Sequence, residues 1–176
     1  MPVRSIVLYP DPVLLSPTRE VLAVDDHVRS LVRDLTDTMQ AAPGIGLAAN
    51  QIGEPIRVCV VDPSAGETDG ELRVFINPSI QLQEGIQTDE EGCLSFPGVT
   101  LEVDRADRIR VRALDAAGVP FVLAADGLLA RVILHEIEHL DGQTFLRNVS
   151  ALRREMVKRD IRKRIKNGDW VTTADR

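Results

Sequence analysis

The sequence predicts an α+β fold, with mixed or antiparallel sheets packed around one central helix. Two strand-like runs rich in β-branched residues, at 56–61 and 72–76, precede an apolar helical stretch at 126–140. Helical spacing of apolar residues also marks a segment near each end of the chain. The 176 residues contain no repeat or low-complexity linker. We therefore expect a single domain over residues 1–176, with its core at about 5–148 and a C-terminal helix at about 150–166.

The composition excludes several classes of protein. Hydrophobic residues make up 44% of the chain and charged residues 27%, which is ordinary for a globular protein. A net charge of −6 argues against a DNA-binding protein, and 3% aromatic residues leave little for stacking on bases. No apolar run reaches the roughly 18 residues of a membrane span, and early prolines disfavour a secretory signal. We expect a cytoplasmic protein in which Cys59 and Cys93 are reduced.

The first helix follows an extended, proline-punctuated segment that ends near residue 24. Apolar residues recur at helical spacing from Val28 to Met39. Asp25 or Asp26 can cap this helix, and Pro43-Gly44 ends it. His27 lies off the apolar stripe, so we interpret it as a solvated surface residue.

Several short segments have the composition of strands. The first two end at Pro63 and Pro78, and Cys59 in the first is most simply a small core residue. Polar and apolar residues alternate in the later ones, and a turn at 116–118 indicates a hairpin. The expected strands are 56–61, 72–76, 80–87, 108–113 and 121–123.

A glycine-rich loop, PGIGLAANQIG, occupies residues 43–53. Its glycines let the backbone approach a ligand or another strand closely. The loop lacks the G-K-[ST] and G-x-G-x-x-G patterns of phosphate-binding loops. A tight turn without a function is the alternative at this point.

The central helix carries the clearest chemical pattern, HEIEHLDG at residues 135–142. His135 and His139 are one turn apart on the same face, so both imidazoles can bind one metal ion beside the proton-transferring group of Glu136. Asp126 can cap this helix, and Gly142 suits the left-handed position after its end. The residues expected to be buried are Leu128, Leu129, Val132, Ile133 and Leu140.

Cys93 is a candidate third ligand. It follows a glycine and two acids in EEGCLS, an unusual context for a core strand. A thiolate binds Zn²⁺ or Fe²⁺ strongly, and with His135 and His139 it makes a three-ligand site with an open position. A simple buried cysteine is the alternative from this segment alone.

Taken together, three segments resemble the motifs of the peptide deformylases: GIGLAANQ, EGCLS and HEIEHLDG, in this order and at these spacings. The likeness also includes YPDPVL near the N-terminus and INP at 76–78, and covers roughly residues 5–150. It implies a metal-dependent hydrolase that removes the formyl group from the N-terminal formyl-methionine of new polypeptides and releases formate. It also implies the family's α+β fold.

The resemblance assigns roles to individual residues. Cys93, His135 and His139 are the implied metal ligands, and Glu136 is the implied general acid and base. Gln51 and the backbone N–H of Leu94 are implied to stabilise the oxyanion, while Ile45 and Gly46 line the substrate groove. Family metal use implies Fe²⁺ in the cell, with Zn²⁺ or Ni²⁺ as substitutes in purified protein.

General chemistry agrees with these roles. A metal ion makes water acidic enough to attack the formyl carbon near neutral pH, and each hydrogen-bond donor on the developing oxyanion contributes on the order of 3 kcal/mol. An apolar pocket is needed for the methionine side chain, and Leu128 and Val132 lie one to two turns before His135.

Two positions depart from the commonest family motif, which has Gln where this chain has Leu134 and Asp where it has Glu138. Position 138 faces away from the metal, so we expect Glu138 to pair with an arginine such as Arg105. Leu134 removes a polar group that could support the site.

The C-terminal segment is basic, with nine Lys or Arg and two acids between Arg147 and Lys166. Ser150 can cap its helix, and Val157, Ile161 and Ile165 form a candidate docking stripe. A solvated helix that covers one side of the domain is one interpretation. Contact with ribosomal RNA is the other.

Two rival functions remain to be weighed. A general metallopeptidase normally takes its third ligand downstream of the helix, but the only histidines are His27, His135 and His139. A non-catalytic or retargeted deformylase-like protein is the alternative, and the presence of Glu136, Gln51 and Cys93 argues against it.

Overall fold

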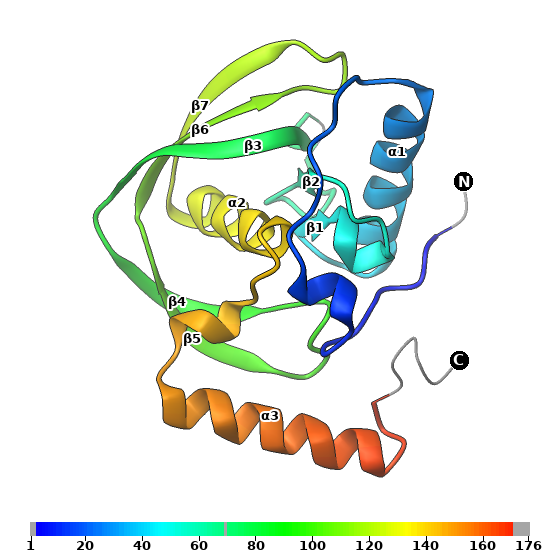
Figure 1. Cartoon of the computed structure of the whole chain (residues 1–176). Helices are drawn as coiled ribbons and strands as arrows, with labels where there is room; N and C mark the ends of the chain where they lie inside the picture. The colour runs from blue at the N-terminus through cyan, green and yellow to red at the C-terminus, as the bar shows by residue number, and fades with distance from the viewer. Residues whose placement is uncertain (1–2, 69, 171–176) are drawn as a thin grey trace.

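The computed structural model describes residues 3–68 and 70–170. Its three α-helices are α1 (Asp26–Ala41), α2 (Gly127–Leu140) and α3 (Ala151–Lys166). Short 3-10 helices cover Pro12–Leu15, Ala49–Ile52 and Phe145–Asn148. Figure 1 shows α2 at the centre of the molecule, with α1 to one side and α3 along the outer edge.

Two antiparallel sheets surround α2, which confirms the α+β fold. The larger sheet has five strands in the order β1-β2-β3-β6-β7, and the smaller consists of β4 and β5. The strands are β1 (Gly46–Ala48), β2 (Val58–Val61), β3 (Arg73–Glu84), β4 (Gln87–Gly92), β5 (Thr100–Arg105), β6 (Arg108–Leu114) and β7 (Pro120–Asp126). The predicted hairpin is the β6–β7 pair, joined in register from Arg108↔Asp126 to Leu114↔Pro120.

Strand β2 shows how the two faces of the large sheet are used. Cys59 and Val61 pack in the same cluster as the buried residues of α2, whereas Val58 and Val60 pack with those of α1. This is the two-residue period of a strand that is buried on both faces. Ile45, which directly precedes β1, packs against the same cluster as α2, so this part of the loop lies on the α2 side of the sheet.

Helix α1 begins and ends where the sequence predicts. The Asp25 carboxylate accepts a hydrogen bond of 2.9 Å from the backbone N–H of Val28, which is an N-cap. His27 is exposed, as expected. The preceding segment differs from the prediction, because Pro12–Leu15 forms a 3-10 turn capped by Asp11.

The prediction of separate strands at 72–76 and 80–87 is wrong, because residues 73–76 and 80–84 both belong to β3. Asn77 takes a left-handed conformation with φ of 52°, and the register against β6 shifts between Ile76 and Ser79. The Asn77 side chain donates to and accepts from the backbone of Val21, each at 2.8 Å. The strand thus continues through a bulge, where Pro78 is tolerated.

The sequence did not predict the β4–β5 hairpin. Strand β4 reads QTDEEG, and within it only Glu91 is buried, so it lacks the alternating apolar residues that mark a strand. Its pairing with β5, from Gln87↔Arg105 to Gly92↔Thr100, nevertheless places Glu91 beneath α2. This hairpin supplies one whole side of the candidate site.

Helix α2 follows the prediction except at its first turn. Leu128 was expected in the buried stripe, but it is 51% exposed, because the first turn projects past the edge of the core. Asp126 occupies the N-cap position without a side-chain hydrogen bond to the helix. Gly142 has a φ of 69°, and a Cβ there would lie 2.6 Å from the backbone of Ser16. This position therefore requires glycine.

Helix α3 is docked on the β4–β5 hairpin by the predicted stripe. Val157, Ile161 and Ile165 pack in one cluster with Phe96, Phe145 and Trp170. Ser150 caps the helix by accepting from the Arg153 N–H at 3.2 Å. Among the described residues, no helix is both long enough and apolar enough to cross a membrane.

Candidate metal centre

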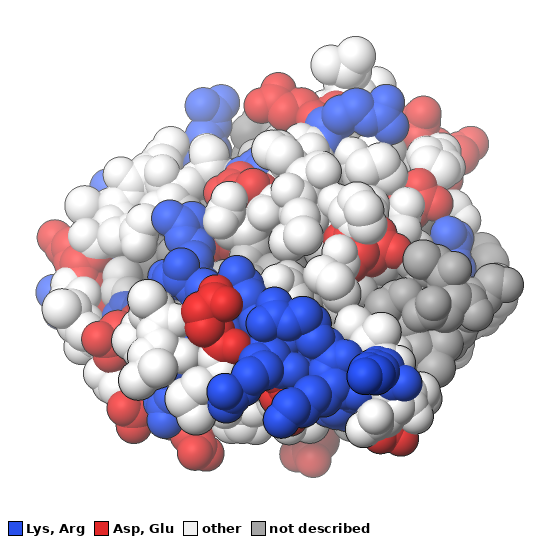
Figure 2. Space-filling view, turned by 60° about the horizontal axis from the view of Figure 1, so that its bottom comes forward, with Lys and Arg blue, Asp and Glu red and all other residues white. Residues whose placement is uncertain are grey.

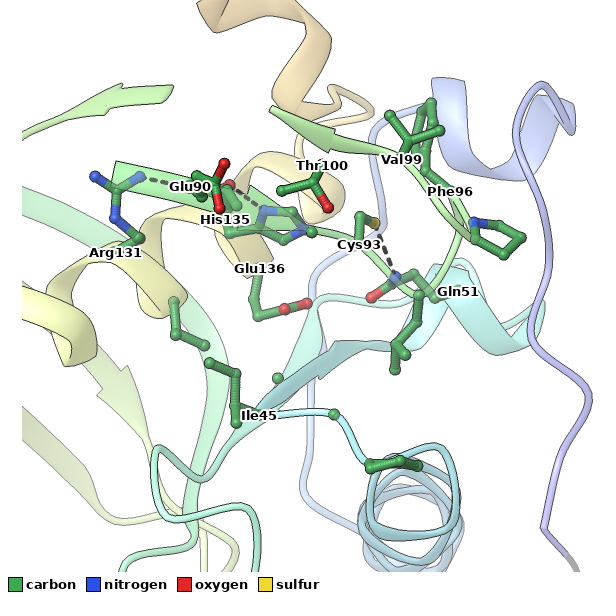
Figure 3. Close-up of a pocket in the computed structure, with 18 of the residues that line it drawn as sticks. Ile45, Gln51, Glu90, Cys93, Phe96, Val99, Thr100, Arg131, His135 and Glu136 are labelled. Atoms are coloured by element: carbon green, nitrogen blue, oxygen red, sulfur yellow. Dashed lines mark hydrogen bonds and ion pairs between the residues drawn. The ribbon is translucent and has the colours of Figure 1, made fainter. Parts of the chain in front are cut away.

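Three side chains from two distant segments converge on one point. The Sγ of Cys93 and one ring nitrogen each of His135 and His139 lie within 4.8 Å of one another. The Nε2 of His139 is 3.2 Å from both the Cys93 sulfur and the His135 Nε2. Figure 3 shows Cys93 and His135 near each other among the side chains that line the pocket.

The fold explains this convergence. His135 and His139 are four residues apart on α2, so both rings project from one face of the helix. Cys93 follows directly after β4, whose pairing with β5 holds it beside that face. Both histidines are buried and Cys93 is half-buried.

The donors fit one divalent ion. A hydrogen bond of 2.5 Å joins His135 Nδ1 to a Glu91 carboxylate oxygen, which leaves Nε2 free to ligate. A thiolate and two imidazoles are the ligands that Zn²⁺ and Fe²⁺ prefer. With three protein ligands, a tetrahedral ion keeps one position for water or substrate.

Burial and local charge set the protonation of the two histidines. Burial, followed by the charge of His135, lowers the pKa of His139 well below its usual value, so its ring is neutral. For His135 burial also opposes protonation, but Cys93 and Glu91 outweigh it and raise the pKa. The negative groups that attract a proton to His135 attract a metal cation in the same way.

Glu91 anchors a buried charge network that the sequence analysis missed. Arg105 binds both of its carboxylate oxygens, at 2.6 and 2.7 Å, and Arg131 binds one of them at 2.9 Å. Burial alone would raise the pKa of Glu91, but the hydrogen bonds from Arg105 and His135 lower it below its ordinary value. Glu91 is therefore an anion that orients the ring of His135. Its place two residues before Cys93 was the available signal.

Glu136 is in the opposite electrostatic situation. Its side chain is buried, and no described residue forms a hydrogen bond with its Oε2. Burial raises the pKa of Glu136 to about 7, with Glu91 adding to the rise. A carboxyl group in this state can take up and release a proton near neutral pH. Figure 3 shows it directed into the pocket below His135.

Gln51 is the residue of the glycine-rich loop that approaches the Cys93 sulfur. The Gln51 Nε2 donates to the Ser95 hydroxyl at 3.1 Å and is 3.7 Å from the Cys93 sulfur. Its Oε1 accepts from the backbone N–H of Ala48 at 2.9 Å, which fixes the amide so that its N–H groups face the thiol. Leu94 follows Cys93 directly.

Asn50 is a second residue that the sequence analysis missed. It is fully buried, and its Nδ2 donates to the backbone carbonyl of His139 at 2.6 Å. Thr18 satisfies the next carbonyl, that of Leu140, at 2.8 Å. The loop that carries Gln51 is therefore tied directly to the last turn of α2. Only the tertiary structure reveals this contact.

A pocket of about 530 Å³ opens onto the centre. Nine of the ten predicted site residues line it, and His139 is the exception. A Cβ on Gly46 would lie 2.8 Å from Val132 and would overlap the Glu136 carboxylate, so only glycine allows this close approach. The apolar part of the wall is formed by Ile45, Leu94, Leu128 and Val132.

Glu138 and Leu134 lie on the opposite side of α2. Glu138 accepts from Arg105 at 3.1 Å and from the Asn148 side chain at 2.9 Å, so the expected ion pair is present. Leu134 packs in the cluster between α2 and the large sheet. It does not line the substrate pocket, and the expectation that it weakens support of the site stays a prediction.

The α+β fold, the Cys-His-His donor set and a buried carboxyl group beside an open pocket define a metal-dependent hydrolase of the H-E-x-x-H type.

Comparison with known proteins narrows this class. The family model described as polypeptide deformylase matches residues 3–155. The peptide deformylase of Acidobacterium capsulatum is 46% identical over 170 residues, which cover 97% of this chain and 100% of that protein. That of Aquifex aeolicus is 45% identical, over 94% and 98% of the two chains. The crystal structure of a peptide deformylase from Legionella pneumophila superposes with a TM-score of 0.86 at 39% identity, covering 94% of this chain and 98% of that one.

The chain belongs to the peptide deformylase family. It is a metal-dependent hydrolase that removes the N-formyl group from newly synthesised polypeptides, and no observation favours a non-catalytic alternative.

Proposed function

We propose that Glu136 is the proton-transferring residue of the deformylation reaction. It takes a proton from the attacking water and delivers it to the amine that leaves when the formamide bond breaks, so that formate and a free N-terminus are the products. The observation that supports this role is the buried carboxyl group whose pKa is raised to about 7, within a pocket that also contains Cys93 and His135.

We propose that Cys93, His135 and His139 hold the metal ion, with Fe²⁺ as the ion in the cell and Zn²⁺ or Ni²⁺ as substitutes. The mutual distances of 3.2 Å and the donor types support this set. The ion supplies Lewis-acid chemistry, which activates water and polarises the formyl carbonyl. Glu91 holds the ring of His135 in place, and Asn50 holds the backbone of His139.

We propose that the side-chain amide of Gln51 and the backbone N–H of Leu94 stabilise the charge on the formyl oxygen. The Gln51 amide lies 3.7 Å from the Cys93 sulfur and is oriented by Ala48 before substrate arrives, and Leu94 directly follows Cys93 in the chain. A preoriented donor needs no rearrangement when charge develops, so it favours the transition state over the ground state.

The substrate is bound by Ile45, Gly46, Leu128 and Val132 in this proposal. The exposed Leu128 at the mouth and the buried Val132 deeper in the pocket give an apolar wall along α2. This wall suits the unbranched, flexible side chain of methionine. Because position 46 is a glycine, the protein backbone there lies close to Glu136 and leaves space that a side chain would fill.

Formate release from formyl-Met-Ala-Ser tests this account. The protein is loaded with Fe²⁺ without oxygen, or with Ni²⁺, and compared with the Glu136→Ala variant. We expect formate only from the unchanged protein, and no acetate from acetyl-Met-Ala-Ser. Equal formate from Glu136→Ala would exclude Glu136 as the proton carrier, and no formate from any formylated peptide would exclude the reaction.

We further propose that α3 contacts ribosomal RNA and that the protein works in the cytoplasm on nascent chains. Figure 2 shows Lys and Arg gathered in one patch over α3, on a chain whose net charge is −6. Such a patch is the local feature that phosphate binding requires. Arg162 and Lys166 are exposed on this helix and do not line either hollow beside it.

Ribosome pelleting at low and high salt tests the contact. Truncation at residue 150 would remove Ile161 and Trp170 from the core, so charge reversal is the better variant. We expect Arg162→Glu/Lys166→Glu to weaken pelleting at low salt while formate release from a short peptide is unchanged. Unchanged pelleting would contradict the proposal.

One buried cluster packs α2 against the large sheet, a second packs α1 against strands of the same sheet, and a third packs α3 against β5. Strand β2 contributes residues to both the first and the second cluster. This arrangement supports our proposal of one domain over residues 1–176, with the catalytic core at about 5–148 and the basic helix appended to it.

A further inference from the structure

A second hollow adjoins the substrate pocket. It has a volume of about 430 Å³ and lies between the segment 98–101 and α3. Gly98, Val99 and Thr100 line both this hollow and the substrate pocket, so they form a shared wall. Figure 3 shows Val99 and Thr100 at the edge of the substrate pocket across from Ile45. We call the second hollow the basic groove.

The charge of the basic groove is strongly one-sided. Arg153, Arg159 and Lys163 line it together with a single acid, Asp160. All three cations are exposed, and among the described residues no carboxylate forms an ion pair with any of them. The overall charge of −6 makes this a local feature of the groove and α3.

The groove is held rigidly relative to the active site. Val157 and Ile161 of α3 pack in the same buried cluster as Phe96 and Leu101, which flank the shared wall. Arg164 adds a hydrogen bond of 2.9 Å from its Nη1 to the carbonyl of Pro97. The helix that carries the cations is therefore fixed in place beside the pocket.

We propose that the basic groove binds the part of the nascent chain that follows the formyl-methionine, and that it favours acidic side chains there. The inference rests on the deformylase reaction, whose substrate is a polymer that must leave the pocket along some path. An extended substrate chain advances about 3.3 Å per residue. It therefore needs only a few residues to cross the shared wall, which is itself three residues wide.

Position along the substrate matters in this proposal. Glu90 is exposed and lines the substrate pocket itself, on the near side of the shared wall. Its charge disfavours an acidic residue directly after the methionine. The preference for acids begins only where the chain has passed Thr100 and reached the cations of α3.

A peptide scan tests the proposal. Formyl-Met peptides of ten residues carry a Glu-Glu pair, moved stepwise from the second residue to the last, in an otherwise Ser/Ala sequence. Each is matched by the same peptide with Gln-Gln. We expect kcat/KM to exceed that of the Gln-Gln peptide by about threefold to fivefold in one window beyond the second residue, as two exposed ion pairs allow. The excess disappears at high salt.

Two double variants with the same charge change locate the effect. Arg159→Glu/Lys163→Glu alters the groove, whereas Arg162→Glu/Lys166→Glu alters α3 outside it. We expect the first to abolish or reverse the preference and the second to retain it. Thermal melting checks that both variants are folded, and the Gln-Gln peptides show whether the deformylase reaction is intact.

Three results would overturn the proposal. One is equal kcat/KM for Glu-Glu and Gln-Gln peptides at every position, with the Gln-Gln peptides turned over normally. Another is equal loss of the preference in both double variants, which would indicate a diffuse field. The third is loss of ribosome pelleting in Arg159→Glu/Lys163→Glu with no change in peptide preference, which would make the groove an RNA surface. Failure on all formylated peptides would instead concern the reaction itself.

Discussion

Helix α2 carries two glutamates, two positions apart, that the fold places in opposite environments. Glu136 faces the substrate pocket, where it is buried and its Oε2 has no hydrogen-bond partner among the described residues. Glu138 faces the other side, where Arg105 and Asn148 bind it. The two residues are of the same type, so their surroundings make the difference. Burial gives Glu136 a raised pKa that suits proton transfer, whereas Glu138 forms a structural ion pair.

The comparison predicts its largest effect for Glu136→Gln. The amide keeps the shape of the side chain but cannot carry the proton, so kcat should fall by about a thousandfold or more. Stability should be unchanged or slightly higher, because a buried carboxyl group without a partner is replaced by a neutral group. Formate release and urea unfolding measure the two effects. A variant that lost stability in proportion to activity would contradict this assignment.

Glu91→Gln extends the comparison to a buried anion that is fully paired. Removing this charge takes away the only carboxylate that pairs with Arg131 among the described residues and leaves Arg105 with Glu138 alone, so we expect a loss of about 3–5 kcal/mol in the free energy of unfolding. The ring of His135 also loses its partner, which should weaken metal affinity by about 10- to 100-fold. Urea unfolding and metal titration test both, and unchanged metal affinity would mean that Glu91 is only structural.

Gln51→Ala sharpens the chemistry on the pocket side. Loss of one oxyanion donor should lower kcat by about 10²- to 10³-fold, with a much smaller change in KM. Ser95→Ala is the matched control, because it removes the hydroxyl that accepts from the Gln51 amide and leaves the amide in place. A rise in KM with kcat preserved would show that Gln51 binds substrate instead.

Glu138→Gln should have the smallest effect. It removes one charge of a pair whose glutamate side chain is 17% exposed, while Arg105 remains paired with Glu91. We expect about 1 kcal/mol of lost stability and activity within about twofold of the unchanged protein. A thousandfold loss of activity would erase the distinction between the two glutamates.

Local patterns predicted the parts of the molecule that depend on neighbouring residues. The i, i+4 spacing of His135 and His139 requires only that 126–140 be helical, and the apolar period shows that it is. Asp25 and Ser150 were predicted as caps for the same reason, because a cap is a contact over three residues. The family motifs, not spacing, joined Cys93 and Gln51 to the histidines.

The missed features all depend on contacts between distant segments. Glu91 reads as one acid in a polar run until the β4–β5 pairing places it under α2 beside Arg105. The 2.6 Å hydrogen bond from Asn50 to His139 spans 89 positions in the chain. Leu128 fits the apolar period, yet the end of the core leaves it exposed at the pocket mouth.

Counting metal in three proteins tests the central claim that Cys93, His135 and His139 bind one ion and Glu136 acts beside it. The unchanged protein, Glu136→Gln and Cys93→Ala are each loaded with Fe²⁺ or Ni²⁺, dialysed, and assayed for metal and formate. We expect one ion per chain in the first two, little in Cys93→Ala, and formate from the unchanged protein alone. A Cys93→Ala protein that kept its metal and its activity would contradict the account.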